Sequence, residues 1–132
     1  MDKIHIKTHS RTELVDITSD VNTAVQKYGV KEGICLVYVP HTTAGVTINE
    51  NADPSVQKDI LNELNKVIPR DGHYTHMEGN ADAHIKSTLV GSSVSVPVSG
   101  SKLALGTWQG IYFCEFDGPR SREAFIQIIK NE

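Results

Sequence analysis

The spacing of apolar residues divides the N-terminal half of the chain into strands. Lys3 to Lys7 alternates between apolar and polar positions, which predicts a strand with one buried face. Gly33 to Val39 is a continuous apolar run, so we expect a central strand that is buried on both faces. Pro40 ends this strand because proline lacks a backbone donor. Val46 to Asn49 predicts a short return strand.

Two stretches carry apolar residues at helical spacing behind good capping residues. The run Thr18 to Asp20 offers N-caps for a helix that Gly29 stops. Asp53-Pro54 pairs an N-cap acid with proline at the first helical position, and the amphipathic stripe that follows runs up to Pro69. Both segments therefore predict helices that pack one face on a sheet.

The C-terminal half begins with a loop and a short helix and then turns to strands. Arg70 to Gly79 is polar and irregular, and Asn80 or Asp82 then caps a helix that Gly91 closes. Predicted strands follow at residues 93–98, 103–105, 111–116 and 124–129, with turns at 99–101 and 117–119. The tight turns favour antiparallel pairing. The expected fold is a β-rich α+β domain, a sandwich-like sheet with two or three helices packed on it.

Composition narrows the class of protein. The 132 residues predict one domain, 1–132, and 39% hydrophobic with 22% charged residues is ordinary for a soluble protein. A net charge of -3 argues against a nucleic-acid or anionic-membrane binder. No apolar run reaches the ~20 residues of a membrane span, and Met1-Asp2-Lys3 lacks a signal-peptide pattern. Cys35 and Cys114 lie in strand-like runs as buried thiols, so we expect a cytoplasmic protein.

The segment from His41 to His84 holds the candidate chemistry. His41 directly follows the predicted central strand, where a strand fixes a side chain at the edge of an open loop, and Thr42 and Thr43 add hydroxyl groups beside it. Imidazole titrates near physiological pH and is the commonest metal ligand. A capping histidine that bonds a loop carbonyl is an equally good interpretation of His41.

His76 and His84 lie on either side of a helix-breaking Gly79-Asn80 pair. A loop can therefore fold His76 back over the first turn that carries His84, and neutral imidazoles near carboxylates suit Zn²⁺. The spacing matches no recognised zinc signature. Histidines without a functional role are the alternative, and that is what we expect of three others, His5, His9 and His73.

Other polar residues stand at the ends of predicted strands. Glu50 lies in a polar cluster that favours a functional role, whereas Asp53 is explained by helix capping and Asp59 by solvation. Trp108 is the only tryptophan, between two glycines, and offers a stacking surface, although a core tryptophan at a sheet bulge is at least as common. Arg120 and Arg122 follow a predicted hairpin turn, where arginines either grip phosphate or are simply solvated.

Five segments in order resemble the YjbQ-like family, which is also called the secondary thiamine-phosphate synthase family. The resemblance rests on His41-Thr42-Thr43-Ala44-Gly45, Asn49-Glu50, Asn80-Ala81-Asp82-Ala83-His84, Gly106-Thr107-Trp108-Gln109 and Asp117-Gly118-Pro119-Arg120. It implies a β-sandwich-like α+β fold, a homotrimer with sites near subunit boundaries, and a metal-associated histidine cluster. Its name implies that a pyrimidine diphosphate is joined to a thiazole phosphate with release of pyrophosphate.

From the residues and this resemblance we assign provisional roles. The metal ligands are His41, His76 and His84, and the ion is zinc, with magnesium as the alternative. Catalytic roles fall to Glu50, Thr42, Thr43 and Arg120, and substrate-binding roles to Trp108, Gln109, Asn80 and Arg122. The expected ligand is a small phosphorylated molecule. A metal-dependent hydrolase of a small phosphate or acyl substrate, and a non-catalytic metabolite-binding trimer, remain open as alternatives.

Overall fold

Eight strands and three helices make up the fold. The structure is a computed structural model that describes residues 1–131. The elements follow in the order β1 (Asp2–Lys7), β2 (Glu13–Asp16), α1 (Thr18–Tyr28), β3 (Gly33–Tyr38), β4 (Ala44–Glu50), α2 (Pro54–Val67), α3 (Ala81–Val90), β5 (Ser93–Ser99), β6 (Lys102–Leu103), β7 (Gln109–Glu115) and β8 (Ser121–Lys130). The predicted β-rich α+β class is confirmed.

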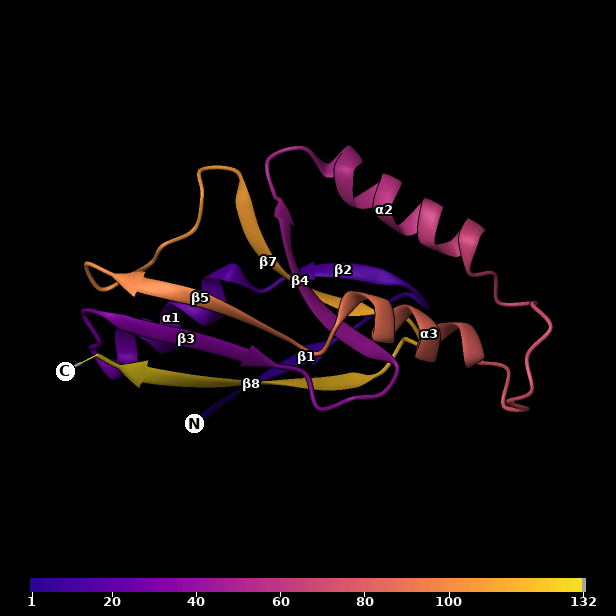
Figure 1. The fold of residues 1–132 in the computed structure, drawn as a ribbon, viewed down its shortest axis with the longest axis horizontal. Helices are drawn as coiled ribbons and strands as arrows, with labels where there is room; N and C mark the ends of the chain where they lie inside the picture. The colour runs from indigo at the N-terminus through magenta and orange to yellow at the C-terminus, as the bar shows by residue number, and fades with distance from the viewer. Residues whose placement is uncertain (132) are drawn as a thin grey trace.

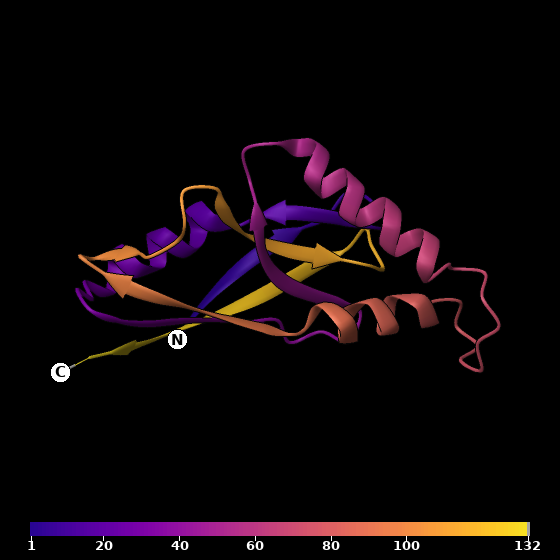
Figure 2. The same cartoon turned by 45° about the horizontal axis from the view of Figure 1, so that its top comes forward.

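The strands form two antiparallel sheets. Sheet A has the order β1-β8-β3-β5-β6, and sheet B has the order β2-β7-β4. The main core fills the space between the two sheets and α1, and a second, smaller core lies where α2 and α3 meet β7. Figures 1 and 2 show α1 at one end of the molecule and the loop that joins α2 to α3 at the other. No helix in residues 1–131 is long and apolar enough to cross a membrane.

The strand that is buried on both faces is β7 and not β3. In β7, Phe113 belongs to the main core and Cys114 to the smaller one. In β3, Val37 faces the core, but Ile34 and Tyr38 on the other face are 48% and 44% exposed. The prediction of two buried faces for 33–39 was therefore wrong, because the outer face of sheet A carries no second layer from residues 1–131. The predicted central position of this strand is confirmed.

Two further predictions need correction. The turn at 117–119 does not form a hairpin, because it carries the chain from β7 in sheet B to β8 in sheet A. The short strand β2 was not predicted, because its four residues carry too little pattern. Both errors concern how strands are distributed between sheets, which depends on contacts that are distant in sequence.

Local signals placed the helix starts well. Asp53 caps α2 as predicted, because its Oδ1 accepts a hydrogen bond of 3.0 Å from the Ser55 amide, and Pro54 is the first helical residue. At α1, the amide of Thr18 donates to Asp16 instead, so the acid before the predicted caps satisfies the helix start. At α3, Asn80 occupies the N-cap position without capping the helix through its side chain.

Candidate functional site

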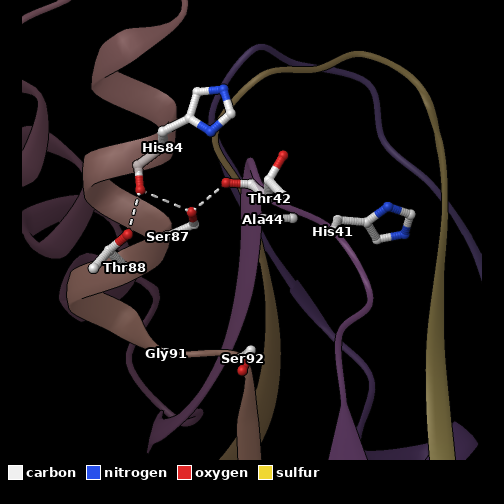
Figure 3. A pocket seen from close by; sticks show the side chains of 8 residues that line it. All are labelled: His41, Thr42, Ala44, His84, Ser87, Thr88, Gly91 and Ser92. Carbon is white, nitrogen blue, oxygen red and sulfur yellow. Dashed lines mark hydrogen bonds between the residues drawn. The ribbon is translucent and has the colours of Figure 1, made fainter.

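A polar hollow lies between α3 and the loop that follows β3. It encloses about 400 Å³, and it is called the histidine hollow below. Figure 3 shows His84 and Ser87 projecting from α3 opposite Thr42 on the loop. The loop and the helix are held together because the Ser87 hydroxyl donates to the Thr42 carbonyl over 2.6 Å. The lining comprises His41, Thr42, Ala44, His84, Ser87, Thr88, Gly91 and Ser92.

The close approach of β4 to the end of α3 shapes this hollow. A side chain at Gly45 would place a Cβ 2.6 Å from the carbonyl oxygen of Gly91, a distance that real Cβ atoms do not reach. Ser87 and Thr88, which sequence reasoning missed, lie one turn after His84 on the same helix face. Their spacing from His84 is the signal that could have identified them.

A second hollow of about 530 Å³ shares His84 with the first, and we call it the loop hollow. His76 approaches His84 from the loop, with ring centroids 5.2 Å apart and planes at 80°. The prediction that the loop folds His76 back over the start of α3 is confirmed. The full lining is His73, Tyr74, Thr75, His76, Ala81, His84 and Ile85, so His73 also lies in a candidate site.

His41 is fixed by the main chain of β8. Its Nε2 accepts a hydrogen bond of 3.0 Å from the amide of Glu123, and its ring packs edge-on against Phe113. Burial, and then the positive charge of Arg122, lower the pKa of His41. Because Nε2 accepts a hydrogen bond, the neutral ring carries its proton on Nδ1. Figure 3 shows this ring turned away from α3.

A buried ion pair supports the loop from beneath. The Nε of Arg122 donates to Glu115 over 2.8 Å, and its Nη2 donates to the Thr43 hydroxyl over 2.8 Å. Burial acts to raise the pKa of Glu115, but hydrogen bonds, first from Arg122, outweigh it and lower that pKa. The structure therefore places Thr43 and Arg122, which we predicted as site residues, below the histidine hollow and outside its lining.

A second buried ionic cluster fixes the far face of α3. Asp82 accepts hydrogen bonds of 3.1 Å from Arg11 and of 2.9 Å from Lys86, and Lys86 also donates to Asn65 of α2 over 2.7 Å. Burial acts to raise the pKa of Asp82, but the bonds from Arg11 and Lys86 lower it to about 2. This cluster ties α3, the loop before β2, and α2 together, so it holds His84 in place.

Three predicted site residues gather elsewhere. Glu50, Trp108 and Gln109 line a separate hollow of about 300 Å³ at the end of β4, whereas Ala44 at its start lines the histidine hollow. The six residue steps between the two ends span about 20 Å at the usual rise of a strand. The structure does not bring these three residues to the histidines of the same chain.

The remaining predicted residues surround Asp117. Its Oδ2 accepts from Asn80 over 2.9 Å and from the guanidinium of Arg120 over 3.1 Å. The Oδ1 of Asn80 is buried and receives no hydrogen bond from the part of the chain that the structure describes. Neither Asn80 nor Arg120 belongs to the lining of the two hollows that His84 joins.

The residues present do not fit the predicted three-histidine metal centre. His84 shares one hollow with His41 and the other with His76, but within residues 1–131 no three His, Cys, Asp or Glu side chains are grouped closely enough to hold an ion. His41 also commits its Nε2 to a backbone amide. We therefore derive no chemical step through a metal, and a bound divalent ion stays a prediction.

Comparison with known proteins agrees with the resemblance. The fold and the hollows define a β-rich α+β domain with a histidine cleft, and the family described as "UPF0047 protein YjbQ-like" matches residues 2–131. The chain therefore belongs to this family.

Relatives of known sequence or structure cover almost the whole chain. A UPF0047 protein of Methanocaldococcus jannaschii is 58% identical over 127 residues, 96% of this chain and 92% of that protein. The UPF0047 protein YugU of Bacillus subtilis is 53% identical and covers 96% of each. Crystal structures from Clostridium acetobutylicum and Sulfolobus solfataricus have TM-scores of 0.96 and 0.95 at 53% and 38% identity. They cover 98% of this chain each, and 100% and 96% of the respective structures.

These findings overturn the predicted reaction. The similar proteins are described as UPF0047 proteins, and the solved relatives as uncharacterized or of unknown function, so none of them carries a thiamine-phosphate synthase activity to this chain. The described residues also lack the predicted three-ligand metal site. The prediction of a metal-associated thiamine-phosphate synthase was wrong, and the metal-dependent hydrolase alternative loses the same three-histidine site.

Proposed function

We propose that this chain is an enzyme that binds a small anionic metabolite in the two joined hollows and exchanges protons with it through His84 and His76. A phosphate ester is the chemical class that we expect. The imidazoles of His73, His76 and His84 and the hydroxyl of Thr42 supply donors to an anion. The described lining residues include no Asp or Glu, although the chain as a whole carries a net charge of -3.

The observation that carries this proposal is the position of His84. It lines both hollows, and its ring lies 5.2 Å from that of His76 between centroids. An imidazole can donate or accept a proton near neutral pH, so two adjacent rings can serve as acid and base on one bound molecule. His41 lies at the edge of the histidine hollow, and its hydrogen bond with Glu123 fixes the tautomer of its neutral ring.

Inorganic phosphate is the first probe. In a histidine-selective NMR titration, phosphate should shift the ring signals of His84 and His76 in a saturable way. The matched control is His9, which is exposed and outside both hollows. His84→Ala should abolish the response, and His9→Ala should leave it unchanged. A phosphate response that is absent, or equal at all histidines, would contradict the proposed anion site.

Turnover is tested with a panel of phosphorylated metabolites. With a substrate found there, His84→Ala should lower kcat by about 10²–10⁴-fold, the usual range for a lost general acid or base. His84→Gln, which keeps a polar side chain without a titrating ring, should be equally inactive. Saturable binding with no turnover across the panel would leave a binding protein and contradict the catalytic part of the proposal.

We also propose that the chain works in the cytoplasm as a homotrimer. The number of subunits comes from the resemblance. An exposed hydrophobic patch on the outer face of sheet A supports association, and it contains Ile34, Tyr38 and Ile129. The two buried free cysteines are compatible with a reducing compartment. Light scattering should give three times the 14.5 kDa chain mass. Ile34→Asp should lower it, whereas Ser19→Asp, at an exposed position in the first turn of α1, should not.

A further inference from the structure

The end of β4 carries a surface that the proposed function does not use. Trp108 is 64% exposed, which is unusual for a side chain that proteins bury well on average. It lines a hollow of about 300 Å³ that we call the indole hollow, together with Ile48, Asn49, Glu50 and Gln109. This indole is the only one in the chain. Because most of its surface is exposed to solvent, it contributes little to the core.

The loop that presents this indole is braced on both sides. The carbonyl of Trp108 accepts a hydrogen bond of 2.9 Å from the amide of Asn51, and the side chain of Gln109 accepts one of 2.8 Å from the amide of Gly106. At Gly110 an added Cβ would lie 2.8 Å from atoms of the Asn51 side chain, so the two loops touch closely there. The backbone that carries the indole is therefore held in place before any ligand arrives.

The neighbouring carboxylate is held just as firmly. One oxygen of Glu50 accepts from the amide of Ala52 over 2.9 Å, while the Glu50 carbonyl accepts from Tyr112 over 3.2 Å and also from Gln57. The second carboxylate oxygen of Glu50 receives no hydrogen bond from residues 1–131. This leaves an acceptor at a fixed position beside the indole.

Two amide groups complete the hollow with donors. The Oδ1 of Asn49 accepts from the amide of Glu50 over 2.7 Å, and the Oε1 of Gln109 accepts from Gly106, so both side chains are oriented by their oxygens. Their NH₂ groups then remain as donors. The indole hollow thus offers a flat apolar face, one charged acceptor and two amide donors.

This combination selects among ligand chemistries. A hydroxyl group both donates to a carboxylate and accepts from an amide, whereas an ammonium group can use only the carboxylate. A ring with hydroxyl groups at its edge and C–H bonds on its face fits all four groups of the hollow. Its face can stack on the indole, while its hydroxyls bond to the carboxylate and to the two amides. We propose that the indole hollow is a second ligand site, which binds a polyhydroxylated ring: a free sugar or the ribose of a nucleoside.

The single tryptophan makes the test specific. Indole emission of the full chain, titrated separately with glucose, ribose and adenosine, should change in a saturable way with at least one of them. A response to glucose and ribose identifies a sugar site, and a response to ribose and adenosine without glucose identifies a ribose site. A response to adenosine alone would indicate stacking of the base on the indole and would contradict the proposal. Tetramethylammonium changing the emission while all three sugars fail would overturn the proposal. So would an emission change that follows only protein concentration, which would indicate a contact between copies.

Variants locate the response. Glu50→Gln should weaken binding by about tenfold, since it removes one charge-assisted hydrogen bond. Gln109→Ala should weaken it less, and Gln127→Ala, on the exposed face of β8, should have no effect. Unchanged affinity in Glu50→Gln would contradict the assignment. His84→Ala should keep the sugar response, and inorganic phosphate should not alter the indole emission, so failure of one site leaves the other testable.

Discussion

The two ends of β4 present two different kinds of surface. At the start, Ala44 opens into the histidine hollow, below which the Arg122–Glu115 pair and the Asp82 cluster are buried. At the other end, Glu50 faces an exposed indole, and the supports there are backbone and amide hydrogen bonds at the surface. Buried ion pairs thus position the residues of the histidine hollow, whereas surface hydrogen bonds within loops position those of the indole hollow.

This difference between the two ends of β4 indicates where the residues that position a binding site also stabilise the fold. Side chains that hold the histidine hollow also hold α2 and α3 on the sheets, since Asp82 is fully buried between groups from three segments. The polar side chains of the indole hollow, Asn49, Glu50 and Gln109, take part in no buried ion pair. We therefore expect substitutions of the buried charged residues below the histidines to weaken the whole protein, and substitutions of the polar side chains that line the indole hollow to affect mainly binding.

The largest effect should follow Asp82→Ala. It leaves Lys86 buried without its carboxylate and deprives Arg11 of its partner, and breaking a buried ion pair in this way costs about 3–5 kcal/mol. Urea denaturation measures the loss in the free energy of unfolding. Glu50→Gln at the other end should change this free energy by less than about 0.5 kcal/mol. Equal losses in the two variants would break the contrast between the two ends.

Acid should weaken the Asp82 cluster in a defined range. The pKa of Asp82 is lowered to about 2 in the folded chain, from an ordinary value of 3.8, by Arg11 and Lys86 against the opposing effect of burial. Its contribution to stability is therefore present above pH 4 and is lost as pH falls through about 2. The difference corresponds to about 2 kcal/mol. Denaturation at stepped pH should show this slope, and Asp82→Asn should flatten it.

Gly110→Ala should have a smaller effect, at the indole end. The new Cβ would lie 2.8 Å from the Asn51 side chain, so the two loops must separate, at a cost of about 1–2 kcal/mol. We expect the emission of Trp108 to shift while the phosphate response of His84 is retained. Gly106→Ala, where the nearest atom is 3.3 Å away at the end of the Gln109 side chain, is the milder control.

The smallest expected signal is the titration of His41. Burial, then the charge of Arg122, lowers its pKa, so in NMR its ring should gain a proton only at a pH below the ordinary 6.5. The depressed pKa also means that its contribution to stability is present above pH 6.5 and is lost as pH falls through the folded value. A ring of His41 that titrates above 6.5 would contradict its burial and its position near Arg122.

Much of the fold could be predicted because the signals are local. The Asp53-Pro54 start of α2, the alternation of β1 and the turn at 99–101 all depend on neighbours within a few residues. The pairing of His76 with His84 was also within reach, since only a short loop separates them. In contrast, the apolar run at 33–39 could not reveal that one of its faces stays open.

The candidate site was predictable only in part. Of the three predicted neighbours, His41 and Thr42 line a hollow, whereas the hydroxyl of Thr43 is buried and accepts a hydrogen bond from Arg122. Conversely, Ser87 and His73 line the two hollows although neither was predicted as a site residue; only the spacing of Ser87 from His84 on one helix face gave a signal. The direction of a single side chain at the end of a strand depends on the opposite sheet, which the local pattern does not encode.

The amino-acid sequence alone determined the class of fold, the helix starts and the burial of Cys35 and Cys114, because each of these depends on short-range periodicity or capping. Only the tertiary structure decided that His41 bonds to Glu123, 82 positions away, and that Arg11 meets Asp82 across 71 positions. Such contacts form when two sheets and three helices pack together. Their geometry is a property of that packing and not of any segment alone.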